Sequence, residues 1–194
     1  MQIENLHNKF DHLHRVISTD KFLNMEALGG EIPFWISAYN PNQEVEIEKE
    51  INNLEKRLSN EGINILLVDL FTLSMEIIQK YVGINELLAI EQKKKKDTFK
   101  RALQSTINIH ERLIPAIKDK VMEQSPKVLF VNGVGKVFPF IRSHNVLNNL
   151  QSSIKTIPTL MFFPGKYTGQ SLELFGLLKD DNYYRAFNID NYKL

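Results

Sequence analysis

The sequence predicts an α/β fold in which a mostly parallel sheet is flanked by helices. Two unbroken apolar runs, 128–131 and 159–163, are short enough to be strands that are buried on both faces of a parallel sheet. Between residues 32 and 83, strand patterns alternate with helix patterns, and each helix pattern ends at a glycine. A chain of 194 residues suits a single domain, 1–194, and buries roughly 70% of the surface that its unfolded form exposes.

An amphipathic docking helix is expected over residues 2–24. Its apolar side chains recur at spacings of three and four and therefore share one face: Ile3, Leu6, Phe10, Leu13 and Ile17. Residues 32–38 match a strand, with Pro33 at its entrance, where the missing backbone donor is tolerated. A turn containing Pro41 then starts a helix that carries glutamates in its first turns and ends at Gly62.

The strand and helix patterns repeat once and are followed by a long helical region. Residues 63–68 match a second strand, and residues 72–82 match a second helix. Residues 84–123 are expected to form a helical insert, which Pro115 should kink or divide. The basic run 93–96 is interpreted as a solvated surface or a junction between two helices, because no aromatic residues interleave with it as in a phosphate-binding patch.

The segment 127–169 is the first place to look for a working face, since loops that leave the carboxyl ends of parallel strands bind ligands and partners. Between its two apolar runs, the pattern over residues 146–150 indicates a short helix with Ser143 as its N-cap. A strand around residues 172–175 is expected to pair back onto the preceding strand as a hairpin.

Composition excludes several classes of protein. The formal net charge is +1 and the charges are mixed along the chain, so charge gives no support to nucleic-acid or anionic-membrane binding. The chain has no cysteine, which excludes disulfides, thiolate metal sites and cysteine nucleophiles. The N-terminus lacks the pattern of a secretory signal, and no apolar run approaches the roughly 20 residues that cross a bilayer. We therefore expect a soluble cytoplasmic protein without a membrane partner.

The sequence lacks the motifs of nucleotide-hydrolysing and dinucleotide-binding enzymes. A P-loop places a glycine-rich turn and a Lys-Ser or Lys-Thr pair after the first strand, whereas residues 39–43 contain neither glycine nor lysine. A GxGxxG fingerprint is absent after every candidate strand. We therefore predict that the protein is not an enzyme and uses no cofactor or metal.

Two other chemistries stay open from the residues alone. The first is binding of an anion such as phosphate without hydrolysis, for which the candidate residues are Gly133, Gly135, Arg142 and Lys166. The second is metal-dependent hydrolysis, for which the candidate residues are Asp69, His144, Asp180 and Asp181. The second hypothesis is the weaker one, because Asp69 lies far along the chain from the other three.

Residues 133–144 spell GVGKVFPFIRSH, which is the most specific motif of the chain. Further distinctive segments are 147–150, Pro158, 163–167, 174–176 and 181–187, together with 31–34, Tyr39 and 62–70. Taken together, these segments resemble the BrxB family of bacteriophage exclusion (BREX) defence systems. The resemblance covers nearly the whole chain, and the helical middle is its least distinctive part.

The resemblance implies a context more than a chemistry. BrxB-like proteins are encoded in operons with a DNA adenine methyltransferase, a PglZ-type protein similar to alkaline phosphatases and a large ATPase, and no catalytic activity is established for the family. The implied function is a non-catalytic interaction or assembly subunit that docks the PglZ-type protein of its operon, with the methyltransferase and the ATPase as further partners. DNA would be contacted only indirectly, within a complex. The order of elements is compatible with a Rossmann-type or degenerate P-loop-like domain.

For such a subunit, we expect the partner-binding residues near the carboxyl edge of the sheet, where Arg and Tyr would anchor an interface. The candidates are Arg142, His144, Lys166, Tyr167, Tyr183, Tyr184 and Arg185. For each of them, packing inside the fold is the competing interpretation. The alternative function is a nucleotide- or phosphate-sensing module without hydrolysis, built on the four anion-binding candidates.

Overall fold

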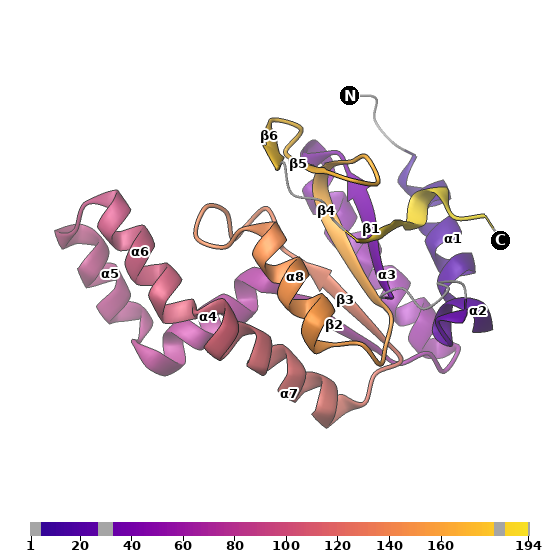
Figure 1. Cartoon of the computed structure of the whole chain (residues 1–194), viewed down its shortest axis with the longest axis horizontal. Helices are drawn as coiled ribbons and strands as arrows, with labels where there is room; N and C mark the ends of the chain where they lie inside the picture. Colours follow the sequence, from indigo (N-terminus) through magenta and orange to yellow (C-terminus); the bar gives the residue numbers. More distant parts are fainter. Residues whose placement is uncertain (1–4, 27–32, 181–184, 194) are drawn as a thin grey trace.

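A mostly parallel sheet lies between two layers of helices in the computed structural model of the chain (Figure 1). The structure describes residues 5–26, 33–180 and 185–193. The parallel strands are ordered β2-β3-β4-β1-β7 across the sheet. Their bounds are Phe34–Tyr39 for β1, Ile65–Asp69 for β2, Val128–Asn132 for β3, Thr159–Tyr167 for β4 and Phe187–Asn188 for β7. The predicted α/β fold with a mostly parallel sheet is therefore confirmed.

The central strands are apolar because helices cover both faces of the sheet. Every residue of β3 is buried, and β1 is buried except at the partly exposed Ala38. Successive side chains of a strand point to opposite faces, so Phe130 contributes to one core and Val131 to the other. Val131 lies opposite Met161 of β4, and both side chains belong to the same core, which therefore reaches the middle of the sheet.

One face of the sheet is covered by the N-terminal helices and α3. Their bounds are Leu6–Ile17 for α1, Asp20–Leu23 for α2 and Glu44–Asn60 for α3, which follows a 3-10 turn, η2, at Pro41–Gln43. The core on this face contains Trp35, Phe130 and Phe162 of the sheet. The rings of Phe10 and Phe162 are stacked with their centroids 6.2 Å apart, which fixes α1 on the strands.

The docking helix expected over residues 2–24 is two helices. Thr19 is extended, and its hydroxyl accepts a hydrogen bond from Phe22 N–H at 3.2 Å, so a new helix starts there. Ile3 lies outside the described residues. Of the remaining predicted positions, Phe10, Leu13 and Ile17 are buried in the core, and Leu6 is partly buried against it.

The other face of the sheet is covered by α4, α7 and α8. Their bounds are Leu70–Tyr81, Ile114–Gln124 and Ser143–Ser153. The core on this face joins Ile36, Val68 and Phe163 of the sheet to these helices. Ser143, the predicted N-cap, is instead the first residue of α8, and Arg142 occupies the cap position without a side-chain hydrogen bond to the helix.

The first part of the predicted helical insert projects away from the sheet as an arm, whereas α7 packs on the sheet (Figure 1). We call residues 84–107 the helical arm; it consists of α5 (Ile84–Lys93) and α6 (Lys96–Ile107), so the basic run contains a helix junction, as predicted. A π-helical turn, η3 (Ile109–Leu113), then leads into α7. The insert is divided at Asn108, where φ is 32°, whereas Pro115 lies in the first turn of α7, where proline is tolerated. Among the described residues, no helix is long and apolar enough to cross a membrane.

A hairpin extends β4 beyond the parallel sheet. The strand β5 (Leu172–Leu174) pairs antiparallel with β4 on one side and with β6 (Leu178–Asp180) on the other, which confirms the predicted hairpin. Gly165 of β4 lies opposite Leu174, and a Cβ at Gly165 would lie 2.0 Å from the carbonyl oxygen of Glu173. Only glycine therefore allows the two strands to approach this closely.

The two ends of the described chain meet at a buried ion pair. Lys9 of α1 lies 2.9 Å from the carboxylate of Asp190, which belongs to the 3-10 helix η4 (Ile189–Asn191), and its ammonium also donates to the carbonyl of Ala38 at 2.8 Å. The Lys9 side chain is 4% exposed. The Asp190 carboxylate accepts further hydrogen bonds from Ser37 Oγ and Ala38 N–H at 2.8 and 3.2 Å. This group therefore joins α1, β1 and η4.

We predict that Asp190→Ala lowers the free energy of unfolding by about 3–5 kcal/mol, because it removes a paired carboxylate from beside the buried ammonium of Lys9. Urea denaturation followed by circular dichroism measures the loss. The matched control is Asp11→Ala, which removes a surface ion pair with Arg57 and should change stability little. A small effect of both substitutions would show that the buried pair does not hold the termini together.

Candidate functional site

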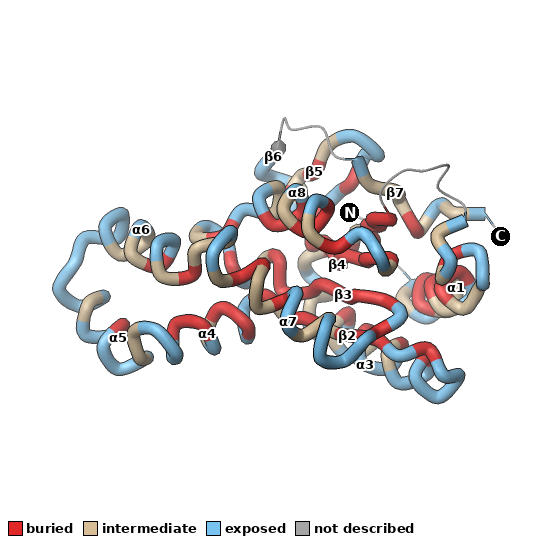
Figure 2. The backbone as a smooth tube through the Cα atoms, turned by 60° about the horizontal axis from the view of Figure 1, so that its bottom comes forward, coloured by how far each residue is buried: buried red, intermediate tan, exposed pale blue. Residues whose placement is uncertain are grey.

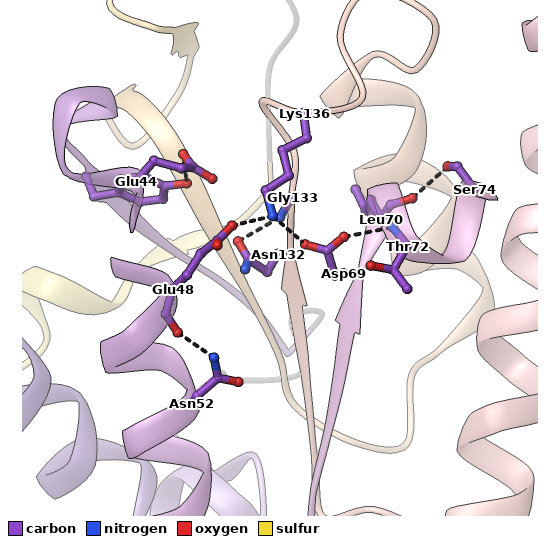
Figure 3. A network of polar contacts seen from close by, with 11 residues as sticks. Glu44, Glu48, Asn52, Asp69, Leu70, Thr72, Ser74, Asn132, Gly133 and Lys136 are labelled. Carbon is purple, nitrogen blue, oxygen red and sulfur yellow. Dashed lines mark hydrogen bonds and ion pairs between the residues drawn. The ribbon is translucent and has the colours of Figure 1, made fainter. Parts of the chain in front are cut away.

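The carboxyl edge of the sheet carries a network of ion pairs centred on Lys136 (Figure 3). We call residues 133–142, which connect β3 to α8, the β3–α8 loop. From this loop the Lys136 ammonium reaches the carboxylate of Glu48 on α3 and lies 3.1 Å from Asp69 Oδ2 at the end of β2. The network therefore joins three segments that are far apart in the sequence.

Each group in this network is positioned by its local structure. Asp69 ends β2 and caps α4, because its Oδ1 accepts a hydrogen bond from Thr72 N–H at 2.8 Å. Glu48 lies in the second turn of α3 and so faces the same edge. The β3–α8 loop turns back after Gly133, whose carbonyl accepts from Lys136 N–H at 3.2 Å.

Gly133 is required where the loop leaves β3. Its φ is +75°, and a Cβ there would lie 2.8 Å from Asp69 Oδ2. The Gly133 N–H donates to the Asn132 side chain at 2.7 Å. The turn therefore places the backbone against a carboxylate, which is an unfavourable neighbour for a bound anion.

A hydrogen-bonded pair of a tyrosine and a carboxylate lies beside this network. Tyr39 at the end of β1 donates its hydroxyl hydrogen to Glu44 Oε2 at 2.7 Å. Burial, and then the neighbouring Glu44 carboxylate, raise the pKa of Tyr39, so the hydroxyl stays a donor. Burial likewise raises the pKa of Glu44, and the Tyr39 hydrogen bond offsets this only in part. Within the described part of the chain, Glu44 Oε1 is buried without a hydrogen-bond partner.

The ion pairs shift Asp69 and Lys136 towards their charged forms. Burial alone would raise the pKa of Asp69, but the hydrogen bonds from Thr72 and Lys136 outweigh it and hold that pKa below its usual value. Burial alone would lower the pKa of Lys136, but its hydrogen bonds to Glu48 and Asp69 outweigh it and raise that pKa. Both groups are therefore charged at neutral pH and neutralise one another.

The outer side of the β3–α8 loop carries exposed aromatic side chains. Phe138 packs edge-on against Phe175 in the turn between β5 and β6, with ring centroids 6.4 Å apart, and both side chains are 37% exposed. Gly135 lies against one member of this pair, since a Cβ there would lie 3.0 Å from both Phe175 and Pro164. The same loop is anchored from within by the buried side chains of Val134, Val137 and Ile141. Phe138 of the exposed aromatic pair is therefore carried by a loop that other side chains anchor in the core.

The residues predicted to bind a partner have different environments. Arg142, Lys166 and Arg185 are exposed, and His144 is partly buried in the first turn of α8. Tyr167 is 8% exposed and donates its hydroxyl hydrogen to the Ala186 carbonyl at 2.6 Å, so it packs the domain, which was the competing interpretation for this residue. Tyr183 and Tyr184 lie outside the described residues.

The alternative chemistries have less geometric support. In the part of the chain that the structure describes, no group of three His, Asp or Glu side chains could hold a metal ion, and Asp69 is engaged as a helix cap. Asp181 lies outside the described residues. Of the four anion-binding candidates, the structure explains Gly133 and Gly135 by close packing, while Arg142 and Lys166 are exposed.

Sequence reasoning missed Lys136, Phe138 and Phe175 as site residues. Lys136 lay within the motif GVGKVFPFIRSH, and Asp69 at a strand end is the kind of residue that could have been paired with it. No local pattern signals the contact of Phe138 with Phe175, because it depends on the hairpin folding back over the loop.

The fold and this edge define a Rossmann-type α/β protein whose own ion pairs fill the region where such sheets bind ligands. Residues 66–189 match the family described as BREX protein BrxB. A BREX protein BrxB of Bacillus cereus (strain H3081.97) is 38% identical over 189 residues, which cover 95% of this chain and 97% of that relative. One of Escherichia coli O9:H4 (strain HS) is 26% identical over 184 residues, which cover 95% and 91%. No solved structure matches the chain.

The chain therefore belongs to the BrxB family and is a component of a BREX bacteriophage-defence system.

We predict opposite effects on stability at pH 7 for two amide substitutions at this edge. Glu44→Gln should stabilise the protein, because the raised pKa of Glu44 means that its ionisation opposes folding, and the amide still accepts from Tyr39. Asp69→Asn should destabilise it, because the lowered pKa of Asp69 means that its ionisation favours folding.

The pH dependence provides the control for this prediction. The gain from Glu44→Gln should shrink as the pH falls and disappear below about 4, since the wild-type carboxyl becomes neutral in both states below the pKa of the unfolded state. The loss from Asp69→Asn should shrink as the pH falls below about 4, through the lowered pKa of the folded state. Urea unfolding at pH 7 and at acidic pH measures both. A shift in the same direction for both variants at pH 7 would contradict the assigned pKa directions.

Proposed function

We propose that this protein is a non-catalytic interaction subunit that docks a PglZ-type protein of its own BREX system. The observation that carries the proposal is the exposed aromatic pair of Phe138 and Phe175 on an anchored loop at the carboxyl edge of the sheet. Aromatic and Arg side chains are enriched at protein interfaces, and a preformed surface loses little conformational entropy on binding.

Further exposed groups surround this pair. Leu177, in the same hairpin turn as Phe175, is 84% exposed. Lys166 lies under that turn, since its Cε is 4.0 Å from the position of a Cβ on Gly176. Arg142 ends the β3–α8 loop and is exposed. We call Phe138, Phe175, Leu177, Arg142 and Lys166 the docking edge.

The inner part of the same loop supports a binding role over a catalytic one. Lys136 and Asp69 neutralise one another, so neither is presented to a substrate as a free acid or base. Arg142 and Lys166 are the observation that favours the alternative, a phosphate-sensing module, because both are exposed cations. The carboxylate of Asp69 beside Gly133 disfavours that alternative.

We predict that the protein co-purifies with the PglZ-type protein of its operon, and that Phe138→Ser with Phe175→Ser weakens the complex at least about thirtyfold. The reason is that the two rings form the apolar centre of the docking edge. Co-expression followed by size-exclusion chromatography and titration calorimetry measures the complex. The matched control is Val45→Ser with Met122→Ser, which removes two exposed apolar side chains (61% and 77%) from α3 and α7.

Two further measurements separate the hypotheses. The double substitution Arg142→Ala with Arg185→Ala tests whether these two cations contribute to binding of the PglZ-type protein. Circular dichroism first confirms that the variant is folded. If the wild-type proteins form no complex at micromolar concentration, docking of a PglZ-type protein is wrong. A phosphate sensor would instead be stabilised by a nucleotide, by about 2.7 kcal/mol at one hundred times its dissociation constant.

A further inference from the structure

We propose that the cleft between the helical arm and the β3–α8 loop binds a short acidic peptide segment that inserts a large apolar side chain. The proposal rests on the proposed function, since it identifies a second contact that the partner would make. The cleft has a volume of about 410 Å³, which is within the range of about 300–1,000 Å³ typical of ligand sites.

The inner walls of the cleft are apolar. Phe99 and Leu103 of α6 form one wall, and Pro139 and Phe140 of the β3–α8 loop form the other. Phe99 and Phe140 are only partly buried, so their rings border the cleft without filling it. A Leu, Phe or Trp side chain of a partner would bury this apolar surface, which is the main favourable term in association.

The rim of the cleft carries more lysines than carboxylates. Lys94, Lys96 and Lys100 line it, together with Glu91 and Asp97. Among the described residues, no carboxylate lies within ion-pair distance of any of these three lysines. Figure 2 shows that this end of the arm is mostly exposed. An acidic segment would supply the counter-charges that the fold does not.

The surroundings of the lysines favour a peptide over a nucleic acid. Single-stranded nucleic acids stack their bases on exposed aromatic faces that lie along a basic groove. Here Phe99 and Phe140 face one confined cleft between two elements, which suits one inserted side chain rather than a row of stacked bases. Complementary charge on the rim would then fix the orientation of the segment.

The test uses the full chain and fluorescent 15-residue peptides that tile the acidic segments of the PglZ-type protein, the methyltransferase and the ATPase of its operon. Fluorescence anisotropy should identify at least one acidic peptide with a large apolar residue that binds. Replacing that apolar residue by Ser at unchanged charge should weaken binding at least about tenfold.

The matched variants place the peptide on the cleft. Charge reversal of the rim, with Lys94→Glu, Lys96→Glu and Lys100→Glu, should weaken binding of the peptide at least about tenfold. The control variant carries the same change in charge on exposed lysines of α3 and α7, with Lys49→Glu, Lys56→Glu and Lys118→Glu, and should weaken binding less than about threefold. Phe140→Ser should also weaken binding, whereas the control leaves the apolar walls unchanged.

Three outcomes would overturn the proposal. Either no acidic peptide binds, or the rim and control variants lose binding equally, or the rim variant loses affinity only for a 20-base single-stranded DNA probe. The last result would assign the lysines to nucleic acid. The proposed function is judged separately. If the rim variant still forms the complex with the PglZ-type protein, docking is retained and only the role of the cleft is ruled out.

Discussion

The ammonium of Lys136 is the group on which the arrangement of the carboxyl edge depends. Glu48 and Asp69 reach this edge from different elements, and two carboxylates that approach one another would repel without a cation between them. Side-chain exposure is 35% for Lys136, 32% for Glu48 and 22% for Asp69, so solvent screens the pairs and their energy is modest. Their main effect is therefore to hold the β3–α8 loop in one position over the sheet.

In that position, the β3–α8 loop presents side chains to two neighbouring elements, the hairpin turn and the helical arm. Its buried side chains and Lys136 fix the inner side, so Phe138 projects towards the hairpin turn and Phe140 projects towards the helical arm. In open α/β proteins this edge usually receives a small ligand. Here the chain's own lysine occupies it, and the surface that remains for other molecules lies on the outside of the loop.

Most of the framework follows from the sequence, and the contacts of the site do not. Apolar runs predicted β3 and β4 because strands buried on both faces need no polar alternation. The partners of Lys136 are not predictable in this way, since Asp69 lies 67 residues earlier and no local pattern records the pairing. The sequence predicts Tyr167 to be a contact residue because it places this Tyr in a loop at the carboxyl edge of the sheet, but β4 extends through Tyr167 into the hairpin and buries it.

A few contacts at its base fix the helical arm relative to the sheet. The arm joins the sheet through α4 and the π-helical turn, where Arg112 lies 4.0 Å from the ring of Tyr81 and donates to the Thr106 carbonyl at 2.6 Å. Phe140 of the β3–α8 loop borders the arm a second time, across the cleft. The loop is thus the element that touches both the hairpin and the arm, so a partner bound to both sides would contact the segment that the Lys136 ion pairs hold in place.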